Sequence, residues 1–305
     1  MKVKYLAKMI LSNCPQWLRY HLRYVRAHKQ ILNINNPKKF SEKIYNRMRS
    51  PKIEFSRLSD KFLVRDYVAK IIGDKYLVPL YTCRSKLDLN IIQDLPESFV
   101  VKATHGAGFV KIVKNKKEEN LSNLIEEVNG WLSKDFSKVG DELHYRNIEP
   151  KIVIEKALLK NGNPPADYKI HVFRKSRHDE PYIFFQVIGG RFDDIQQSFF
   201  LEDWTPAPFT RKSAKSIQDP ELLEKPNCID EMIDIAKRLS EPFGYCRVDL
   251  YVFDDAPYFG EMTFTPFCGN YVFEPKKWDS ILGEYFGWPE LLEKNEVVTK
   301  ISKNN

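Results

Sequence analysis

The sequence predicts an α+β fold built mainly from antiparallel sheets. Segments 99–113 and 246–264 each contain two stretches of alternating polar and apolar residues around a short turn, which is typical of antiparallel hairpins. Strands and helices do not alternate regularly, as they would in a parallel sheet. With 305 residues, 43% of them hydrophobic, the chain is long enough for two lobes with separate cores and is not a disordered protein.

The predicted elements follow in order along the chain. A helix begins near Ser41 and ends before Pro51, and a stronger helix covers 59–72, with Ser59 as its N-cap and Gly73 as its C-cap. Residues 121–136 and 228–240 are also predicted to be helical. Strands are expected at 76–83, 98–104, 109–114, 151–158, 167–175 and 181–190, before the hairpin at 246–264.

The net charge of +7 is concentrated at the N-terminus. Residues 1–41 contain nine Lys or Arg and no acid, whereas the remainder has 39 basic and 41 acidic residues. Segment 17–28 predicts a basic helix that suits an anionic membrane surface or a polyanion, and alternatively a packed helix with solvated arginines. Its apolar face is expected to carry Leu18, Leu22 and Val25, and its basic face Arg19, Arg23 and Arg26, beside Trp17, Tyr20 and Tyr24.

The five cysteines form no C-x-x-C pair, which favours free thiols in a reducing compartment. No apolar run approaches the roughly 20 residues of a membrane-spanning helix. We therefore expect a cytoplasmic protein, with peripheral binding at the inner face of the membrane through its basic N-terminal arm.

The hairpin at 246–264 brings two acids together. If Phe253 pairs with Pro257, the register sets Asp249 opposite Glu261. Like charges opposite each other destabilise a sheet by up to about 1 kcal/mol, and a hard cation between them would convert this cost into a binding site. The alternative is an exposed sheet face with solvated acids.

Segment 99–113 contains a glycine turn, 105–108, between two strands. Its backbone N–H groups suit phosphate oxygens, and Lys102 precedes it, although a plain turn explains the glycines equally well. A P-loop or a Rossmann fingerprint is excluded because no helix follows. The apolar strand predicted at 151–158 changes to charged residues at Glu155 and Lys156. One face of segment 167–173 carries Asp167, Lys169 and His171.

In this order and spacing, these segments resemble the TupA-like ATP-grasp family over roughly residues 36–285. The resemblance rests on the motifs NPKKFSEKI, DKFLVRDYV, LPESFVVKATHGAG, IEPKIVIEKAL, DYKIHVF, FGYCRVDLYVF and YFGEMTFTPFCG. It implies an ATP-grasp fold, in which two α+β lobes with mainly antiparallel sheets sandwich the nucleotide. We expect a basic helical arm at 1–55, a lobe with the glycine loop at 56–150, a lobe with the metal hairpin at 151–275 and a helical tail at 276–305.

The resemblance also implies roles for single residues. The ATP-binding residues would be Lys61, reaching the phosphates from a helix, with Lys102, His105, Gly106, Ala107, Gly108, Glu155, Lys156, Leu158 and Asp167. Mg²⁺ would be held by Asp249, Glu261 and Thr263, while Arg247 and Lys169 would stabilise the transferring group. Thr263 departs from the Glu-x-Asn pattern of many ATP-grasp ligases. No strand–helix–strand unit precedes Lys61, so their separate substrate domain is missing or replaced.

The implied function is an ATP- and Mg²⁺-dependent carboxylate–amine ligase that works through an acyl phosphate. Its partners would be an amino acid or amine and a carboxylate-bearing glycan or glycolipid precursor, such as a uronic acid of a capsule or other surface polysaccharide. A kinase acting on a glycan hydroxyl is the alternative that these motifs leave open, and a polyanion-binding module is a second. We expect no nucleic-acid partner.

Overall fold

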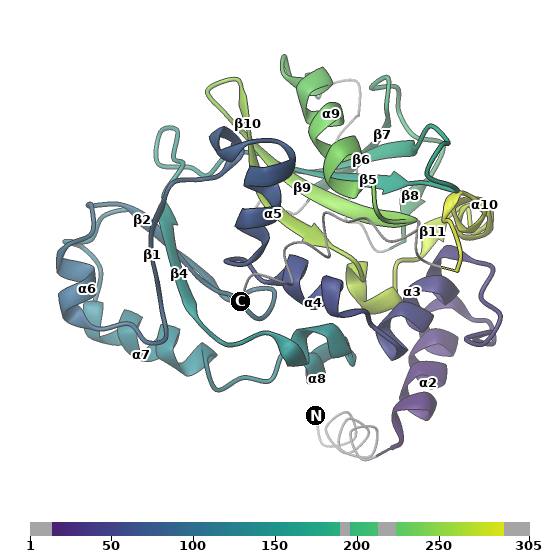
Figure 1. Cartoon of the computed structure of the whole chain (residues 1–305), viewed down its shortest axis with the longest axis horizontal. Helices are drawn as coiled ribbons and strands as arrows, with labels where there is room; N and C mark the ends of the chain where they lie inside the picture. The colour runs from purple at the N-terminus through teal and green to yellow at the C-terminus, as the bar shows by residue number, and fades with distance from the viewer. Residues whose placement is uncertain (1–13, 190–195, 213–223, 290–305) are drawn as a thin grey trace.

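The computed structural model describes residues 14–189, 196–212 and 224–289 and confirms the α+β fold. Figure 1 shows two lobes, one around a four-stranded sheet and one around a five-stranded sheet. All strand pairs within both sheets are antiparallel. Among the described residues, no helix combines the length and hydropathy required to cross a bilayer.

The smaller lobe has the strand order β1-β4-β2-β3. Its apolar core lies between this sheet and α6 and α7, and includes Phe99, Val101, Leu124 and Ile154. Two short segments, α8 and the 3₁₀ helix η2, lead from α7 back to the sheet. Its elements are β1 (Leu80–Arg84), α6 (Leu89–Gln93), β2 (Phe99–Ala103), β3 (Val110–Val113), α7 (Leu121–Trp131), α8 (Ser137–Gly140), η2 (Leu143–Asn147) and β4 (Ile152–Lys156).

The larger lobe has the strand order β10-β9-β5-β6-β7, and β8 pairs separately with β11. Helices α4, α5 and α9 pack on one face of the sheet, against Ile170, Phe185 and Val248. The strands are β5 (Asp167–Phe173), β6 (Tyr182–Gly189), β7 (Gln196–Leu201), β8 (Thr210–Arg211), β9 (Tyr245–Phe253), β10 (Ala256–Thr263) and β11 (Phe273–Glu274). The helices are α4 (Ile53–Ser59), α5 (Val64–Ile71), η1 (Asp74–Tyr76) and α9 (Ile229–Ser240).

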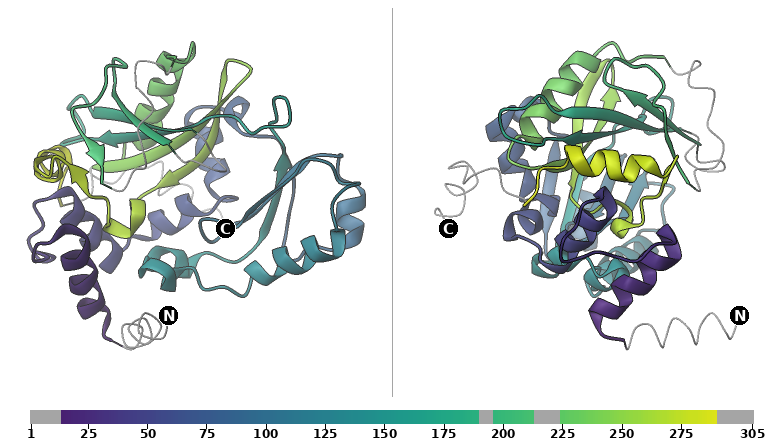
Figure 2. Two further views of the ribbon diagram at one scale, coloured as in Figure 1. Left: turned by 180° about the vertical axis from the view of Figure 1, so that it is seen from behind. Right: turned by 90° about the vertical axis from the view of Figure 1, so that its right-hand side faces the viewer.

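The opposite face of this sheet is covered at one end by helices from both ends of the chain. These are α2 (Gln16–His28), α3 (Phe40–Arg49), η4 (Pro266–Gly269) and α10 (Lys277–Tyr285). Figure 2 shows α10, α3 and α2 on one side of the sheet and α9 on the other. Buried aromatic rings, among them Phe40, Phe173, Phe184 and Tyr245, fill this interface. Residues 16–49 thus share a core with the larger lobe, while the domain boundaries at 55, 150 and 275 stay predictions.

The helix at 16–28 forms, but it buries a different face from the predicted one. Tyr20 and Tyr24 are fully buried, whereas Leu22 and Val25 are each 45% exposed. Two of the three arginines are tied down, because Arg19 and Arg23 pair with Asp141 of the smaller lobe at 2.5 and 2.8 Å. The helix is therefore packed, as the alternative interpretation held, but Arg19 and Arg23 are paired and not merely solvated.

The helix predicted from Ser59 to Ile72 also differs. Ser59 ends α4, and α5 begins only at Val64. The side chain of Asp60 accepts the backbone N–H groups of Phe62 and Leu63, which stabilises a turn between the two helices. Lys61 consequently lies in this turn and not in a helix as expected. Gly73 follows α5 with a φ of 102°, as suits a terminating glycine.

The hairpin pairs Asp249 with Glu261 as predicted, although the pairing next to the turn differs from the prediction. Phe253 pairs with Ala256 and not with Pro257, because Asp254 and Asp255 form a two-residue turn with φ values of 50° and 57°. A bulge between Phe259 and Glu261 then shifts the pairing by one residue and restores Glu261 opposite Asp249.

Candidate functional site

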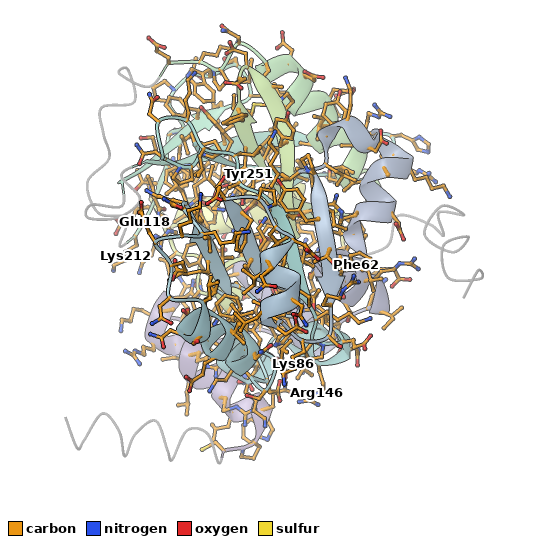
Figure 3. The ribbon with its side chains drawn as sticks, turned by 90° about the vertical axis from the view of Figure 1, so that its left-hand side faces the viewer. Phe62, Lys86, Glu118, Arg146, Lys212 and Tyr251 are labelled. Carbon is orange, nitrogen blue, oxygen red and sulfur yellow. The ribbon has the colours of Figure 1, made fainter. Side chains whose placement is uncertain are left out.

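A cleft of about 930 Å³ lies between the two lobes. Strands β2, β3 and β4 of the smaller lobe contribute one wall, and β9 and β10 of the larger lobe contribute the other. Tyr251 of β9, labelled in Figure 3, lines the cleft together with residues of the smaller lobe. Of the predicted site residues, those that line it are Lys61, Lys102, Ala107, Gly108, Glu155, Lys156, Leu158 and Glu261.

A buried carboxylate on the wall of the smaller lobe is paired with one cation from each lobe, Lys102 of β2 and Arg65 of α5. Glu155 accepts from Lys102 Nζ at 2.7 Å and from Arg65 Nη1 at 2.8 Å. Burial lowers the pKa of Lys102, but the Glu155 carboxylate outweighs it and raises this pKa above its ordinary value. The group has two positive charges and one negative charge, so it can attract phosphate. Arg65 was not predicted from the sequence, although it lies four residues after Lys61.

The glycine loop packs tightly against the ring of Phe136. A Cβ at Gly106 would lie 2.7 Å from the ring of Phe136, and Gly108 has a φ of 81°, so both positions favour glycine. Lys61 Nζ donates to the Gly106 carbonyl oxygen. Burial lowers the pKa of Lys61, an effect that Glu261 opposes. Lys61 thus links the glycine loop to the turn between α4 and α5.

The side chain of His105 is directed away from the cleft lining. Its Nε2 lies 3.2 Å from the carbonyl oxygen of Trp131, and its ring contacts Phe109 with 5.5 Å between the ring centroids. Burial lowers the pKa of His105, so the imidazole is neutral around pH 7. Only its backbone can serve the predicted ATP-binding role, which stays a prediction.

The wall of the larger lobe carries the paired acids, and two cations hold them. Arg247 donates to both oxygens of Asp249, at 2.6 and 2.8 Å, and to Glu261 and Thr263 at 3.1 and 2.9 Å. Lys169 Nζ lies 2.5 Å from Asp249 and 2.9 Å from Asp167. Burial lowers the pKa of Lys169, but Asp249 brings it up to about 12. Both cations therefore stay charged beside the acids.

This cluster offers hard oxygen ligands that fit Mg²⁺. Glu261 is the open ligand, because its side chain is 36% exposed and its Oε2 has no partner among the described residues. Asp249 would have to share its oxygens with Arg247 and Lys169, and Thr263 supplies a hydroxyl. In the described part of the chain, no group of three Asp, Glu, His or Cys side chains is placed so that it could hold a metal ion.

Of the remaining predicted residues, Lys156 and Leu158 line the cleft and Asp167 does not. Leu158 makes no backbone hydrogen bond within the described residues, so its N–H and C=O groups are available to a purine edge. The N–H of Lys156 already donates to the Pro79 carbonyl oxygen at 2.9 Å. Asp167 is buried behind Lys169 and does not line the cleft, so its assignment to ribose stays a prediction.

The apolar part of the cleft was not anticipated from the sequence. Its wall suits a flat aromatic base better than a charged group. The signal for Tyr251 was present, since it shares the alternating face of Arg247 and Asp249. The apolar residues that line the cleft include Val78, Val100, Val110, Ile112, Leu158, Leu159, Pro164 and Pro165.

The family described as TupA-like ATPgrasp matches residues 42–287. No curated protein matches the chain. Several solved structures resemble the chain, each with low identity. The D-alanine–D-alanine ligase of Bacillus anthracis complexed with ATP is 20% identical, with a TM-score of 0.39, over 70% of this chain and 57% of that one.

Two further solved structures resemble the chain at similar levels. The D-alanine–D-alanine ligase of Helicobacter pylori is 16% identical, with a TM-score of 0.42, over 75% of this chain and 61% of that one. The N5-carboxyaminoimidazole synthetase of Staphylococcus aureus is 15% identical, with a TM-score of 0.41, over 77% of this chain and 54% of that one. The chain thus spans less than two thirds of the length of each of these three enzymes.

The acid cluster predicts that Asp249 and Glu261 differ in their importance for folding. Asp249→Asn removes the charge that compensates Arg247 and Lys169, and breaking such a buried pair costs about 3–5 kcal/mol. Glu261→Gln should cost less than about 1 kcal/mol, because this side chain is partly exposed. Urea denaturation of both variants measures the difference. Equal losses of unfolding free energy would contradict this account.

The cleft also predicts that Lys102 distinguishes ATP from adenosine. Lys102→Met should raise the Kd for ATP by roughly tenfold or more, because a charge-assisted phosphate contact is lost, and change adenosine binding by less than about threefold. Isothermal titration with both ligands measures this. Lys117→Met is the matched control, since this lysine is exposed on the same lobe. Equal weakening of both ligands would indicate a folding defect instead.

Proposed function

Because the chain belongs to the TupA-like ATP-grasp family, we propose that it is an ATP-dependent ligase that joins a carboxylate to an amine. One observation carries the proposal. Lys61, Lys102 and Glu261 line the same cleft of about 930 Å³, and Glu261 belongs to the compensated acid cluster of the larger lobe. Such an arrangement binds a polyphosphate between the lobes and places its terminal phosphate near the acids.

We place the triphosphate along Lys61, Lys102 and the glycine loop. The base would lie against the apolar wall, with its edge at the free backbone groups of Leu158. Arg65 would hold Glu155, and Glu155 in turn would keep Lys102 charged and oriented. When bound by Asp249, Glu261 and Thr263, Mg²⁺ would supply charge neutralisation at the phosphates.

The proposed reaction has two steps, phosphorylation of the carboxylate and attack of the amine. A carboxylate oxygen of the substrate attacks the γ-phosphorus, the bond from this phosphorus to the bridging oxygen breaks, and ADP leaves. The amine nitrogen then attacks the carbonyl carbon of the acyl phosphate, the carbon–oxygen bond to phosphate breaks, and the amine proton passes to the departing phosphate. Arg247 and Lys169 contribute fixed positive charge where negative charge develops, and require no reorganisation because Asp249 already orients them.

For the substrates we propose an amino acid or amine and a carboxylate-bearing glycan, such as a uronic acid of a surface polysaccharide or its precursor. Resemblance to the family supports this choice of glycan. A kinase acting on a glycan hydroxyl would use the same nucleotide site, and the products separate the two reactions.

The ligase is tested by following oxygen. The protein is incubated with ATP, Mg²⁺, each amino acid and a galacturonate oligosaccharide whose carboxylates carry ¹⁸O. An acyl phosphate transfers one labelled oxygen to the released phosphate, and mass spectrometry of the glycan shows an amide. A phosphorylated glycan would instead support the kinase. ADP release without label in the phosphate would contradict the ligase.

We further propose that the outer side of α2 contacts an anionic membrane. Trp17 is 61% exposed, Leu22 and Val25 are each 45% exposed, and Ile31 beyond the helix is 84% exposed. Exposed Arg26 lies beside them, within a segment of nine basic residues and no acid. Apolar side chains flanked by positive charge suit the headgroup region of a bilayer. Arg19 and Arg23 do not contribute, because Asp141 holds both.

The membrane proposal predicts that apolar residues of α2 control vesicle binding. Trp17→Ser combined with Leu22→Ser should weaken binding to phosphatidylglycerol vesicles by roughly tenfold or more, since two exposed apolar side chains are lost. Added salt should also weaken the wild-type interaction. Leu89→Ser is the control, because Leu89 is 47% exposed on the other lobe. Binding that is insensitive to both salt and the α2 variant would contradict the proposal.

A further inference from the structure

Helix α2, which packs on the larger lobe, also holds a turn of the smaller lobe. Arg19 donates to both carboxylate oxygens of Asp141, from Nε at 2.9 Å and from Nη2 at 2.5 Å. Arg23 Nη1 lies 2.8 Å from the same carboxylate and donates to the Gly140 carbonyl oxygen at 2.7 Å. The Tyr20 hydroxyl donates to the backbone carbonyl oxygen of Asp141 at 2.7 Å. Three side chains of α2 therefore converge on one turn.

This contact is largely removed from water. Asp141 is buried, and the side chains of Arg19 and Arg23 are only 19% and 25% exposed. A buried ion pair is stable only when its geometry satisfies the charges, and the two-point contact from Arg19 meets this condition. The contact thus fixes the position of the turn more firmly than an exposed ion pair would.

The next residue along the chain, Glu142, is held by the larger lobe as well. Its carboxylate accepts the hydroxyl of Thr265 and, at 3.1 Å, the thiol of Cys268. Both donors belong to the segment that follows β10. A Cβ at Gly140 would overlap the sulfur of Cys268, so the close approach requires glycine. Residues 140–142 consequently lie between α2 and the segment after β10.

The same part of the smaller lobe carries the ring against which the glycine loop packs. Phe136 immediately precedes α8 and Asp141 immediately follows it, so a single helical turn separates the two residues. The ring of Phe136 leaves no space for a Cβ at Gly106. Tyr145 packs edge-on against this ring, with 4.8 Å between the centroids. Because the packing is tight, a shift of residues 136–145 would also release the loop.

The glycine loop itself borders the nucleotide cleft. Ala107 and Gly108 line it, and Lys61 of the same cleft donates to the loop backbone. The Ala103 N–H donates to the Phe109 carbonyl oxygen at 3.0 Å and closes the loop at its base. Backbone N–H groups that are already oriented bind phosphate with less loss of conformational entropy than those of a mobile loop.

We propose that α2 positions the glycine loop for phosphate binding, through the contact of Arg19 and Arg23 with Asp141. The contacts run from the arginines to Asp141, through α8 to Phe136, and from its ring to the loop. Helix α2 precedes residues 42–287, so the match to the family does not include it. The inference rests on the proposed function, which supplies ATP as the source of the phosphate. None of the three charged residues lines the cleft, so they act as positioning residues.

Hydrogen exchange of the ligand-free full chain tests whether α2 holds the loop. In Arg19→Gln combined with Arg23→Gln, the Ala103 amide should exchange roughly fivefold faster or more, because the loop opens more often when its support is released. Amides in the middle of β5 should be unaffected and serve as the internal reference. Wild-type exchange of Ala103 in this variant overturns the proposal.

A matched control separates the contact from a loss of positive charge. Lys29→Gln combined with Lys38→Gln also removes two charges from the N-terminal segment. Both lysines are exposed, and their side chains have no hydrogen-bond or ion-pair partner in the described part of the chain. This variant should retain wild-type exchange at Ala103, and faster exchange equal to that of the arginine variant would overturn the proposal.

Isothermal titration measures the consequence for the nucleotide. Arg19→Gln combined with Arg23→Gln should raise the Kd for ATP by roughly fivefold or more and the Kd for adenosine by less than about twofold, because only the phosphates contact the loop. Arg19→Lys combined with Arg23→Lys should restore part of the ATP affinity, since lysine keeps the charge and loses the two-point contact. A purely structural role of α2 would weaken both ligands equally, and that result would contradict the proposal.

Thermal denaturation shows whether the glutamine variant is folded. If it is not, the lysine variant decides, because its Ala103 amide should exchange faster than in wild type, and wild-type exchange there overturns the proposal. The two levels of inference also separate. Failure of wild type to bind ATP contradicts the proposed function, whereas exchange at Ala103 without ligand still determines whether α2 positions the loop.

Discussion

The larger lobe depends on compensating two acids that a hairpin places opposite each other. Asp249 and Glu261 pair across β9 and β10, and Arg247 contacts both of them. Lys169 adds a second cation from β5. Arg247 and Asp249 of this cluster are buried, and Glu261 borders the interlobe cleft. The same compensation leaves one oxygen of Glu261 without a partner among the described residues and holds both cations in place.

The other half of the same sheet face is covered by apolar and aromatic side chains, and the N-terminal segment supplies much of that cover. Arg47 of α3 is buried and donates to the backbone carbonyl oxygens of Phe264 and Tyr245. Its guanidinium lies 4.9 Å from the ring centroids of both Phe55 and Phe286. These contacts tie α3 to the ends of β9 and β10, so the segment before residue 50 supports the strands that carry the acids. Between residues 14 and 60, the described part of the chain that precedes Lys61, only helices and loops are found.

Local sequence rules succeeded where the pattern is short and failed where distant residues intervene. The alternation of β9 and β10 correctly paired Asp249 with Glu261, yet the pairing of Phe253 was wrong by one residue, because the aspartate turn is tighter and a bulge near Gly260 compensates. The sequence did not show which face of α2 is buried. Tyr20 and Tyr24 pack into an aromatic core, and Asp141 pairs with Arg19 and Arg23.

The sequence by itself determined the α+β class, the glycine loop and the paired acids, because each depends on residues within about twenty positions of one another. Order and spacing of the motifs were also sufficient to identify the family. Only the tertiary structure revealed Arg65 beside Glu155, the exposed side of α2, and the pairing of its arginines with Asp141. These arrangements join residues far apart in the chain, and which partner satisfies a charge is decided by packing, for which one sequence contains no local signal.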